Sequence, residues 1–375
     1  MLAQPTSRLI AACTAFFRTV ISTAMLVRYA ALVRWRPSVA EFKRIFITTS
    51  FGRTVMAVGL VLVSLPTCSR PTPTQQVTLR IGVFRILDDL PYFVMQEQGF
   101  AKRHGLQFVE VSYQSGPAVI EAMAAGVVDA AANIGTAPVL AAAEGGLVPG
   151  TIMSVGASTF ADPEHPAFAV LVAPSINRWK DLEGQYVATN ATNSHSAIAM
   201  RQRLHQEDVH ATTLVITPMA NMGLSVAGGN VAAAVMTEPW LTQSLLRGDG
   251  KLFGWVIGGP PFERVEHSMI LFRTDLYRDN PQVVKAFLRA HLQAVRWIDQ
   301  HPEQARSILA KWLGLSQEVA QKVQLLRWAL DARNDPALLE SVQPLLVEIG
   351  LLKARIPSNQ LYDETLLEAV LAEKR

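Results

Sequence analysis

Two loop-to-helix junctions in one stretch of the chain have the residue types that bind an anion or another polar ligand group. Residues 115–117 (Ser-Gly-Pro) open one predicted helix, and residues 135–138 (Gly-Thr-Ala-Pro) open the next. Proline suits the first turn of a helix, and Thr136 can serve as an N-cap. The first N–H groups of a helix are unpaired and attract negative charge. The alternative interpretation is that both junctions are ordinary turns of an α/β protein.

Other polar residues follow predicted strands elsewhere in the chain. Residues 190–194 (Asn-Ala-Thr-Asn-Ser) are capping residues before a helix that begins at His195. Asp88 and Asp89 lie in a predicted loop, and Glu238 lies just before another helix. If these carboxylates face a ligand site, they favour an amine or a protonated heterocycle, because an unpaired carboxylate near an anion is costly. The alternatives are solvated turn residues for the two aspartates and an ordinary helix-start residue for His195.

The sequence carries no motif of a catalytic, metal or cofactor site. It has no His-Glu-x-x-His spacing, no P-loop and no Gly-x-Gly-x-x-Gly. Its two cysteines, Cys13 and Cys68, precede the predicted globular part, which excludes a catalytic cysteine or a cysteine metal site within that part. His195 and Glu238 could form an acid–base pair, but their spacing does not support one. We therefore expect a protein that is not an enzyme and that uses no metal or cofactor.

The charge of the 375-residue chain is unevenly distributed. The net charge is +3, yet residues 1–68 contain eight Lys or Arg against one acidic residue, Glu41. The remaining chain is therefore mildly acidic, which gives no support for binding nucleic acid. The length is enough for two domains after such a leader.

The leader contains two apolar segments. The first, residues 9–33, is interrupted by arginines, and residues 1 to about 45 as a whole are interpreted as a first membrane helix or as translation from a misassigned start. The second, residues 55–66, follows basic residues and has the length of a signal peptide. It leads into Ser-Leu-Pro-Thr-Cys, which resembles a bacterial lipoprotein box with Cys68 as the lipidated residue. The alternatives are plain cleavage near Cys68 and an uncleaved anchor. Residues 69–76 are expected to form an extended tether.

From residue 77 onward, predicted strands and helices alternate. The predicted strands are residues 77–84, 107–113, 150–158, 167–173, 186–189, 213–216, 231–236 and 267–273. The chain after Pro281 is expected to be helical, including residues 318–330 and 338–349. This order predicts an α/β fold with mostly parallel sheets, in which ligands lie beyond the carboxyl ends of the strands. Residues 125–130 are echoed by residues 228–233, which suggests two similar lobes around a shared cleft.

The order of short motifs over residues 77 to about 370 resembles that of the extracytoplasmic solute-binding proteins of ABC importers, in the nitrate, sulfonate, taurine and thiamine-precursor branch. The motifs are residues 90–93 (Leu-Pro-Tyr-Phe), 98–100 (Gln-Gly-Phe), 115–117, 125–129, 135–138, 179–184 (Trp-Lys-Asp-Leu-Glu-Gly) and 237–239 (Thr-Glu-Pro). The resemblance implies a type II periplasmic-binding-protein fold, with two lobes joined by two hinge strands. Residues 77–166 and 267–375 would form lobe one, and residues 174–266 lobe two. Residues 167–173 and 267–273 would be the crossings.

The resemblance also implies a function. A monomeric periplasmic protein, anchored to the membrane where Cys68 is lipidated, would capture a sulfonate, nitrate, carboxylate or similar solute between its lobes. It would deliver that solute to the permease and ATPase subunits of an ABC importer. The alternatives are a binding protein for a thiamine pyrimidine or another amine or heterocycle, and an enzyme on the same fold. Such enzymes, the fungal pyrimidine synthases and the desulfinases, depend on cysteines that this part of the chain lacks.

The expected site combines residues that the resemblance implies with polar and aromatic residues of the neighbouring loops. Phe160 and Trp240 could stack on a ring or simply pack. The expected ligand-binding residues are Asp88, Ser115, Gly116, Gly135, Thr136, Ala137, Phe160, Asn190, Thr192, Asn193, Ser194, His195, Glu238 and Trp240.

Overall fold

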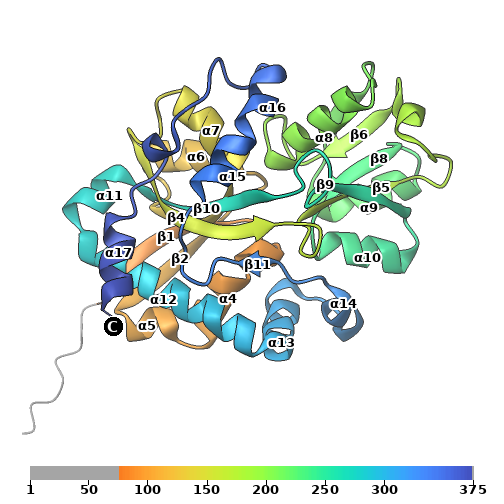
Figure 1. The fold of residues 1–375 in the computed structure, drawn as a ribbon. Coiled ribbons are helices and arrows are strands. Elements are labelled where there is room, and N and C mark those ends of the chain that lie inside the picture. Colours follow the sequence, from red (N-terminus) through yellow and green to blue (C-terminus); the bar gives the residue numbers. More distant parts are fainter. Residues whose placement is uncertain (1–75, 374–375) are drawn as a thin grey trace, which may run out of the picture. The chain divides into compact units, whose positions relative to one another are not determined.

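Two β-sheets, each flanked by helices, make up residues 76–373, the part of the chain that the computed structural model describes (Figure 1). The expectations for the leader, for Cys68 and for the tether fall on residues before 76 and lie outside the described residues. Within residues 76–373, no helix is both long enough and apolar enough to cross a membrane.

The first sheet is mixed rather than mostly parallel. Its strand order is β11-β4-β10-β3-β1-β2. β1 pairs in parallel with β2 and β3, whereas β10 runs antiparallel between β3 and β4. The strands are β1 (Val77–Val83), β2 (Leu106–Ser112), β3 (Ala130–Gly135), β4 (Ile152–Ala161), β10 (Val265–Arg273) and β11 (Arg327–Trp328). We call this sheet and the helices packed on it lobe one.

The second sheet repeats the same plan. Its order is β7-β6-β8-β5-β9, with β6 parallel to β7 and β8, and β5 antiparallel to β8 and β9. The strands are β5 (Phe168–Val172), β6 (Tyr186–Thr189), β7 (Thr213–Ile216), β8 (Ala233–Met236) and β9 (Lys251–Ile257). We call this sheet and its helices lobe two. The internal echo in the sequence therefore corresponds to two similar α/β units.

The chain crosses between the lobes just before the strands that the sequence marked as crossings. β5 lies wholly in the second sheet and β10 wholly in the first, so the crossings are residues 162–167 and 258–264. The predicted crossings were therefore wrong. Both stretches are apolar because β5 and β10 are interior strands buried on both faces, and not because they connect the lobes. The two crossings touch: a Cβ on Gly258 would lie 2.4 Å from Pro166 Cα, and Gly258 has a φ of +82°.

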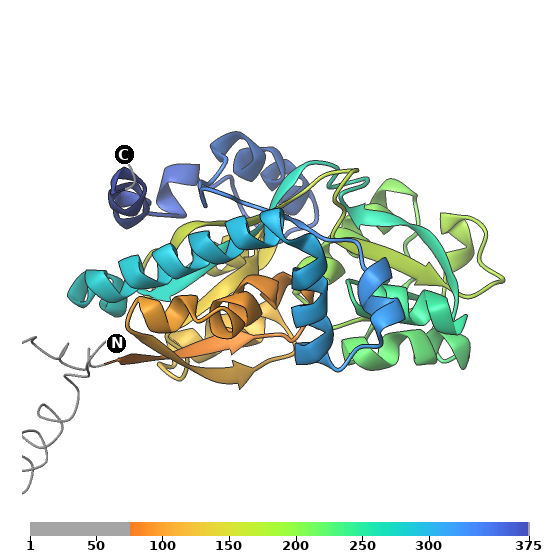
Figure 2. The same cartoon turned by 90° about the horizontal axis from the view of Figure 1, so that it is seen from below.

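Helices cover both sheets. The long helix α12 (Pro281–Gln300) starts with proline and packs its apolar face against α4 (Leu90–Glu97) and α5 (Phe100–Arg103) (Figure 2). The other helices of eight or more residues are α6 (Gly116–Ala124), α7 (Thr136–Glu144), α8 (His195–Gln206), α9 (Met219–Ala227), α10 (Trp240–Arg247), α13 (Pro302–Leu313) and α17 (Thr365–Ala372). The shorter ones are η1 (Leu87–Asp89), η2 (Trp179–Leu182), α11 (Thr274–Asp279), α14 (Gln317–Lys322), α15 (Pro336–Ser341), α16 (Gln343–Glu348) and η3 (Ser358–Gln360).

Two predicted helices of the C-terminal region are shorter than expected. The helix predicted over residues 318–330 ends as α14 at Lys322, and Arg327–Trp328 form β11 against β4. Apolar side chains at short spacing fit either a helix or an edge strand, so the pattern alone could not decide. The helix predicted over residues 338–349 is split into α15 and α16 at Val342, and Pro344 lies in the first turn of α16.

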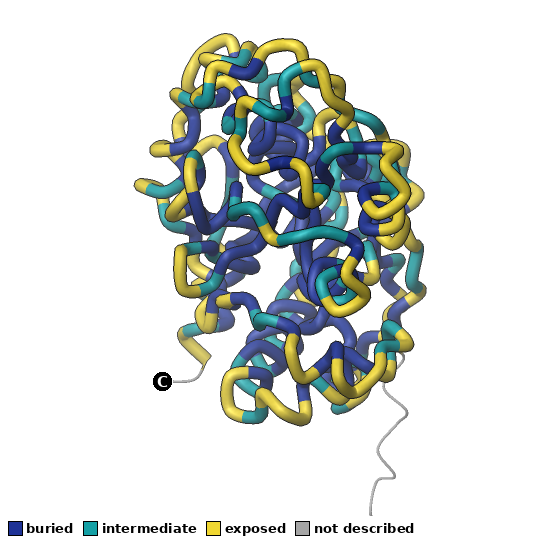
Figure 3. The backbone as a smooth tube through the Cα atoms, turned by 90° about the vertical axis from the view of Figure 1, so that its right-hand side faces the viewer, coloured by how far each residue is buried: buried dark blue, intermediate teal, exposed yellow. Residues whose placement is uncertain are grey.

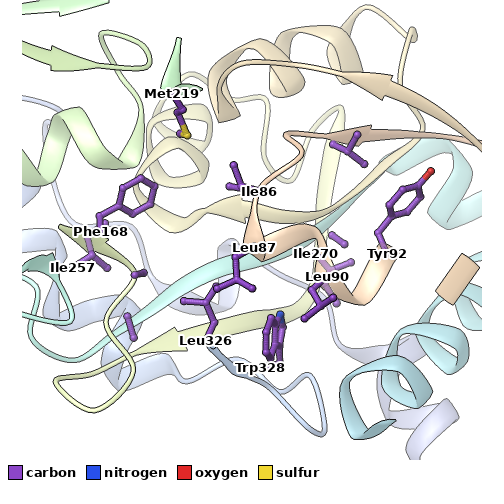
Figure 4. Close-up of a cluster of buried hydrophobic side chains, with 14 of the residues drawn as sticks. Ile86, Leu87, Leu90, Tyr92, Phe168, Met219, Ile257, Ile270, Leu326 and Trp328 are labelled. Carbon is purple, nitrogen blue, oxygen red and sulfur yellow. The ribbon is translucent and has the colours of Figure 1, made fainter. Parts of the chain in front are cut away.

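The apolar core runs without interruption from one lobe to the other. Buried side chains of β1, η1 and α4 join those of β5 and β9, and Figure 4 shows Leu87 of lobe one beside Leu326, with Phe168 and Ile257 of lobe two in the same cluster. Figure 3 shows the buried backbone inside both lobes, with exposed residues on the outer loops. The lobes are therefore in contact through apolar side chains as well as through the crossings.

Glu266 on β10 fixes the C-terminal region to lobe one. Its Oε1 accepts a hydrogen bond from Asn334 Nδ2 at 2.6 Å, and its Oε2 accepts one from the Asp335 N–H at 2.7 Å. The side chain is almost fully buried, and this burial raises the pKa of the carboxyl to about 8.

The raised pKa predicts a pH-dependent stability. Between the ordinary pKa of 4.5 and about 8, folded Glu266 holds a proton that the unfolded chain releases, so its contribution to stability falls as the pH rises. Glu266→Gln removes the titrating carboxyl and therefore this fall in stability. The side-chain amide of Asn334 can rotate by about 180° so that its oxygen accepts from the N–H group of the new glutamine. Between pH 5 and pH 9 we expect Glu266→Gln to gain about 2–4 kcal/mol of unfolding free energy relative to the wild type, measured by urea unfolding. The control is Glu121→Gln on the exposed face of α6, whose difference from wild type should stay flat.

Candidate functional site

A small pocket lies where the two lobes meet. Its volume is about 40 Å³, and residues from both sheets enclose it. Figure 4 shows three of its apolar residues, Ile86 from lobe one and Phe168 and Met219 from lobe two. The lining residues are Phe84, Ile86, Asp88, Ser115, Gly116, Asn133, Gly135, Pro138 and His267 from lobe one, and Phe168, Asn190, Ser194, His195, Ser196 and Met219 from lobe two.

Half of the predicted site residues line this pocket. They are Asp88, Ser115, Gly116, Gly135, Asn190, Ser194 and His195. The structure places Thr136, Ala137, Phe160, Thr192, Asn193, Glu238 and Trp240 elsewhere.

The residues placed elsewhere have other contacts. Thr136 is buried in the first turn of α7 and donates from Oγ1 to the Glu266 carbonyl at 2.5 Å. Ala137 is buried beside it, Asn193 is exposed, and Trp240 packs half-buried against the core. Phe160 and Thr192 line two other hollows of the surface.

Glu238 caps a helix instead of facing the pocket. Its Oε2 accepts from the Thr242 N–H at 3.1 Å and its Oε1 from Thr242 Oγ1 at 2.7 Å, which satisfies the start of α10. Burial raises the pKa of this carboxyl. Its backbone carbonyl accepts from the Leu87 N–H at 3.1 Å, so Glu238 contributes to the contact between the lobes. No motif in the sequence separates a cap carboxylate from a ligand carboxylate.

Three helix N-termini meet at the pocket. Ser115 precedes α6, Gly135 precedes α7, and Ser194 precedes α8. Ser194 is a true N-cap, because its Oγ accepts from the Ala197 N–H at 3.3 Å. The dipoles of three helices therefore place partial positive charge around the pocket, which favours an anionic ligand group.

Asn190 ties the lobes together. Its Nδ2 donates to the Gln114 carbonyl of lobe one at 2.8 Å, and its Oδ1 accepts from Ser196 Oγ at 2.7 Å. Its amide is therefore occupied by the protein, although Asn190 lines the pocket as predicted. We infer that it holds the loop before α8 against lobe one.

A buried pair of Asp88 and His267 forms the wall on the side of lobe one. Asp88 Oδ1 lies 3.1 Å from His267 Nε2, and each side chain is 3% exposed. Within residues 76–373, Asp88 Oδ2 and His267 Nδ1 have no hydrogen-bond partner. His267 was not among the predicted site residues, because no motif marks it and its stretch has the apolar composition expected of a hinge strand.

His195 faces His267 across the lobe boundary. Their rings stack with centroids 5.1 Å apart and planes 20° apart. Burial first, and then the neighbouring His267, hold the pKa of His195 well below its usual range, so its ring is neutral at pH 7. Its Nδ1 has no partner among the described residues.

Asp88 and Asp89 are both buried, so neither is a solvated turn residue. Asp89 holds the backbone and Asn133 in place beside the pocket. Its Oδ2 accepts from the Phe84 and Ile86 N–H groups at 2.9 and 3.2 Å, and its Oδ1 accepts from Asn133 Nδ2 at 2.9 Å. Burial raises the pKa of Asp89 to about 7. The bond orients the Asn133 amide so that Oδ1, unpartnered within the described chain, is left at the pocket.

The pocket thus combines positive helix ends with unpaired acceptors. In the described part of the chain, no lysine or arginine lines it. No hydroxyl donates to His267 Nδ1 among residues 76–373, so Asp88 and His267 do not extend into a Ser–His–Asp triad. The arrangement suits binding of a small solute that has an anionic end and an N–H or O–H donor.

The possible metal cluster of the described residues lies away from the pocket and is already paired. Asp162, Glu164 and His165 could bring one atom each within 4.8 Å at the first crossing. Asp162 Oδ1 accepts from the Glu164 and His165 N–H groups, and Oδ2 accepts from Arg327 Nη1 at 3.0 Å. A cation there would compete with the guanidinium, so this geometry is that of a structural turn.

A close contact across the lobe boundary depends on Gly135. A Cβ at this position would lie 2.8 Å from His195 Nδ1 and 2.9 Å from His195 Cβ. The φ of Gly135 is −55°, which alanine adopts without strain, so contact with His195 is the main cost of Gly135→Ala. We expect this substitution to lower the unfolding free energy by about 1–3 kcal/mol in urea titration.

The matched control is the same substitution in a chain that lacks the imidazole. In His195→Gly, which removes Cβ together with the imidazole, the added methyl group has room, so Gly135→Ala should cost less than about 0.5 kcal/mol. An equal loss of unfolding free energy with and without the His195 side chain would show that contact with His195 is not the cause.

A sequence model described as the NMT1-like family matches residues 72–314. No curated protein sequence matches the chain.

Solved structures share the fold at low identity. The alkanesulfonate-binding protein SsuA from Xanthomonas axonopodis pv. citri, bound to MOPS, has a TM-score of 0.64 at 20% identity, over 77% of this chain and 99% of its own. The periplasmic nitrate-binding protein NrtA from Synechocystis PCC 6803 has a TM-score of 0.65 at 16% identity, over 80% and 89%. The desulfurization enzyme DSZB has a TM-score of 0.57 at 19% identity, over 80% and 100%. The predicted periplasmic-binding-protein fold is therefore confirmed.

Proposed function

The chain belongs to the NMT1-like family, and from this premise we propose that it is the solute-binding component of an ABC importer. Its solute is held in the pocket between the lobes and carries both an anionic head group and a hydrogen-bond donor. The observation that carries the proposal is the meeting of three helix N-termini with Asp88 at one small pocket between the lobes.

The anionic head is the part that the sequence analysis expected. Unpaired N–H groups at the starts of α6, α7 and α8 can donate to a sulfonate or carboxylate, and the helix dipoles add attraction. The ligands named for SsuA and NrtA, an alkanesulfonate and nitrate, are of this kind. Exclusion of water between the lobes would strengthen these bonds.

The donor group is required by the buried acceptors. Asp88 Oδ2 and Asn133 Oδ1 lack partners among the described residues, and leaving buried acceptors unpaired costs about 1–3 kcal/mol each. An ammonium, an amide N–H or a protonated ring nitrogen would satisfy them. Since no lysine or arginine of the described chain lines the pocket, a solute of zero net charge fits better than a simple anion. Amino sulfonates and amino carboxylates have this chemistry.

Delivery to a permease and its ATPase is the matching role outside the cytoplasm. The fold and the family support an extracytoplasmic protein, and the basic, apolar leader supports export. We propose that Cys68 is the lipidated residue and that the protein acts as a monomer. We take residues 77–161 with 265–373 as lobe one and residues 168–257 as lobe two, because the strands divide between the two sheets in this way.

An enzymatic role is the second candidate, because DSZB has the same fold. Residues 76–373 contain no cysteine, and no hydroxyl of that region is bonded to His267. A nucleophile therefore lacks its usual arrangement. We propose binding without turnover, and recovery of a chemically changed solute would support the enzyme instead.

Matched ligands test the two parts of the solute separately. Isothermal titration of the chain with taurine, ethanesulfonate and ethanolamine compares the whole zwitterion with each half. We expect taurine to bind at least about tenfold more tightly than ethanesulfonate, because the ammonium satisfies Asp88. Equal binding of taurine and ethanesulfonate would favour a simple anion. Binding of ethanolamine alone would favour an amine or heterocycle.

Asp88→Asn tests the carboxylate. Asparagine keeps the shape and can still accept from His267, but it presents an N–H group where the ligand donor would lie. We expect affinity for the zwitterion to fall by about tenfold or more, while affinity for a simple sulfonate does not fall. The control is Asp279→Asn, which removes an equal charge from an exposed position at the end of α11.

A further inference from the structure

We propose that lobe two carries a second ligand site, a groove between α8 and β7 that binds a small organic monoanion with an apolar body. The groove has a volume of about 420 Å³, within the range of small-molecule pockets. Residues of lobe two alone line it, so it is separate from the pocket between the lobes and does not depend on its function.

An uncovered sheet face forms the floor. Leu214 and Ile216 of β7 point to the same face, because they are two residues apart on a strand. β7 is the edge strand of the second sheet, and Ile216 is 64% exposed. Leu204 of α8 forms the opposite wall. An apolar ligand body would cover this exposed surface.

Arg201 supplies the positive charge. It lies on α8 one turn before Leu204 and lines the groove, half-buried. Among the described residues, its guanidinium has no ion pair and no hydrogen-bond partner. Arg203, two residues on, differs because it pairs with Glu207 at 2.6 Å and lies over the Trp179 ring. Burial lowers the pKa of Arg201, and an anion in the groove would relieve this cost.

A buried hydroxyl supplies a second, independent observation. Thr189 at the end of β6 lines the groove and is 0% exposed, and within residues 76–373 its Oγ1 has no hydrogen-bond partner. A buried hydroxyl is costly to leave unpaired, and a carboxylate or sulfonate oxygen would accept from it.

The rim limits the charge of the ligand. His205 Nδ1 lies 3.7 Å from Glu348 Oε1, and His210 Nε2 lies 2.6 Å from Asp208 Oδ1. The carboxylates of Glu348 and Asp208 are thus the partners of the two histidines, and they repel additional negative charge on a ligand. One unpaired arginine therefore favours a single negative charge, attached to an aromatic or aliphatic body.

The test uses 1-naphthoate as the probe and 1-naphthalenemethanol as its uncharged match, each titrated calorimetrically into the full chain. We expect naphthoate to bind with a dissociation constant below about 1 mM and at least about tenfold more tightly than the alcohol. Arg201→Gln should weaken naphthoate binding by about tenfold, Arg201→Lys should weaken it less, and Thr189→Val should weaken it measurably. The control is Arg355→Gln, an equal charge change at an exposed residue outside the groove.

Two further titrations with naphthoate distinguish this site from the pocket between the lobes. Asp88→Asn and saturating taurine should both leave naphthoate binding unchanged. Competition by taurine, or loss of binding in Asp88→Asn, would place the naphthoate in the interlobe pocket and overturn the proposal. Wild-type affinity in Arg201→Gln, equal affinity for the alcohol, or absence of binding to the wild type would each overturn it as well.

Discussion

The buried contact between Asp88 and His267 forms the surface of lobe one on which His195 of lobe two stacks. Its atoms lie 3.1 Å apart with almost no exposure to water, so each group relies on the other for compensation. His195 of lobe two stacks on His267, and its burial holds the pKa of its ring well below the usual range, so this ring is neutral. The lobe boundary is therefore polar at its centre and apolar around it. Its unpaired atoms define what a ligand must offer.

The general fold could be read from the sequence because its signals are local. Alternating strands and helices, glycine and proline at helix starts, and the repeated Gly-containing turns each act over a few residues. The same local signals located Ser115, Gly135 and Ser194 at helix starts, and all three line the pocket. Convergence of three N-termini follows from the common rule that ligands lie at the carboxyl ends of strands.

The remaining parts of the site depend on distant partners, which a single sequence does not reveal. His267 gains its role from Asp88, 179 residues away, and Asn133 gains its role from Asp89, 44 residues away. Glu238 was misjudged for the opposite reason, because its partner Thr242 is only one helical turn away and makes it a cap. The crossings were misplaced because central strands and hinge strands have the same apolar composition. Burial on both faces could be recognised only once the sheet order was known.

The position of β10 between β3 and β4 also constrains how the protein is made. The first sheet cannot be completed until β10 and β11 have left the ribosome, since both strands follow the whole of the second sheet in the chain. The second sheet, by contrast, is built from one uninterrupted segment between Phe168 and Ile257 and can form as soon as it is synthesised. During translation, β3 and β4 therefore expose unpaired edges while the second sheet is being made. A chain of this design is most open to wrong strand pairing in that interval, and an inserted second lobe that folds quickly shortens it.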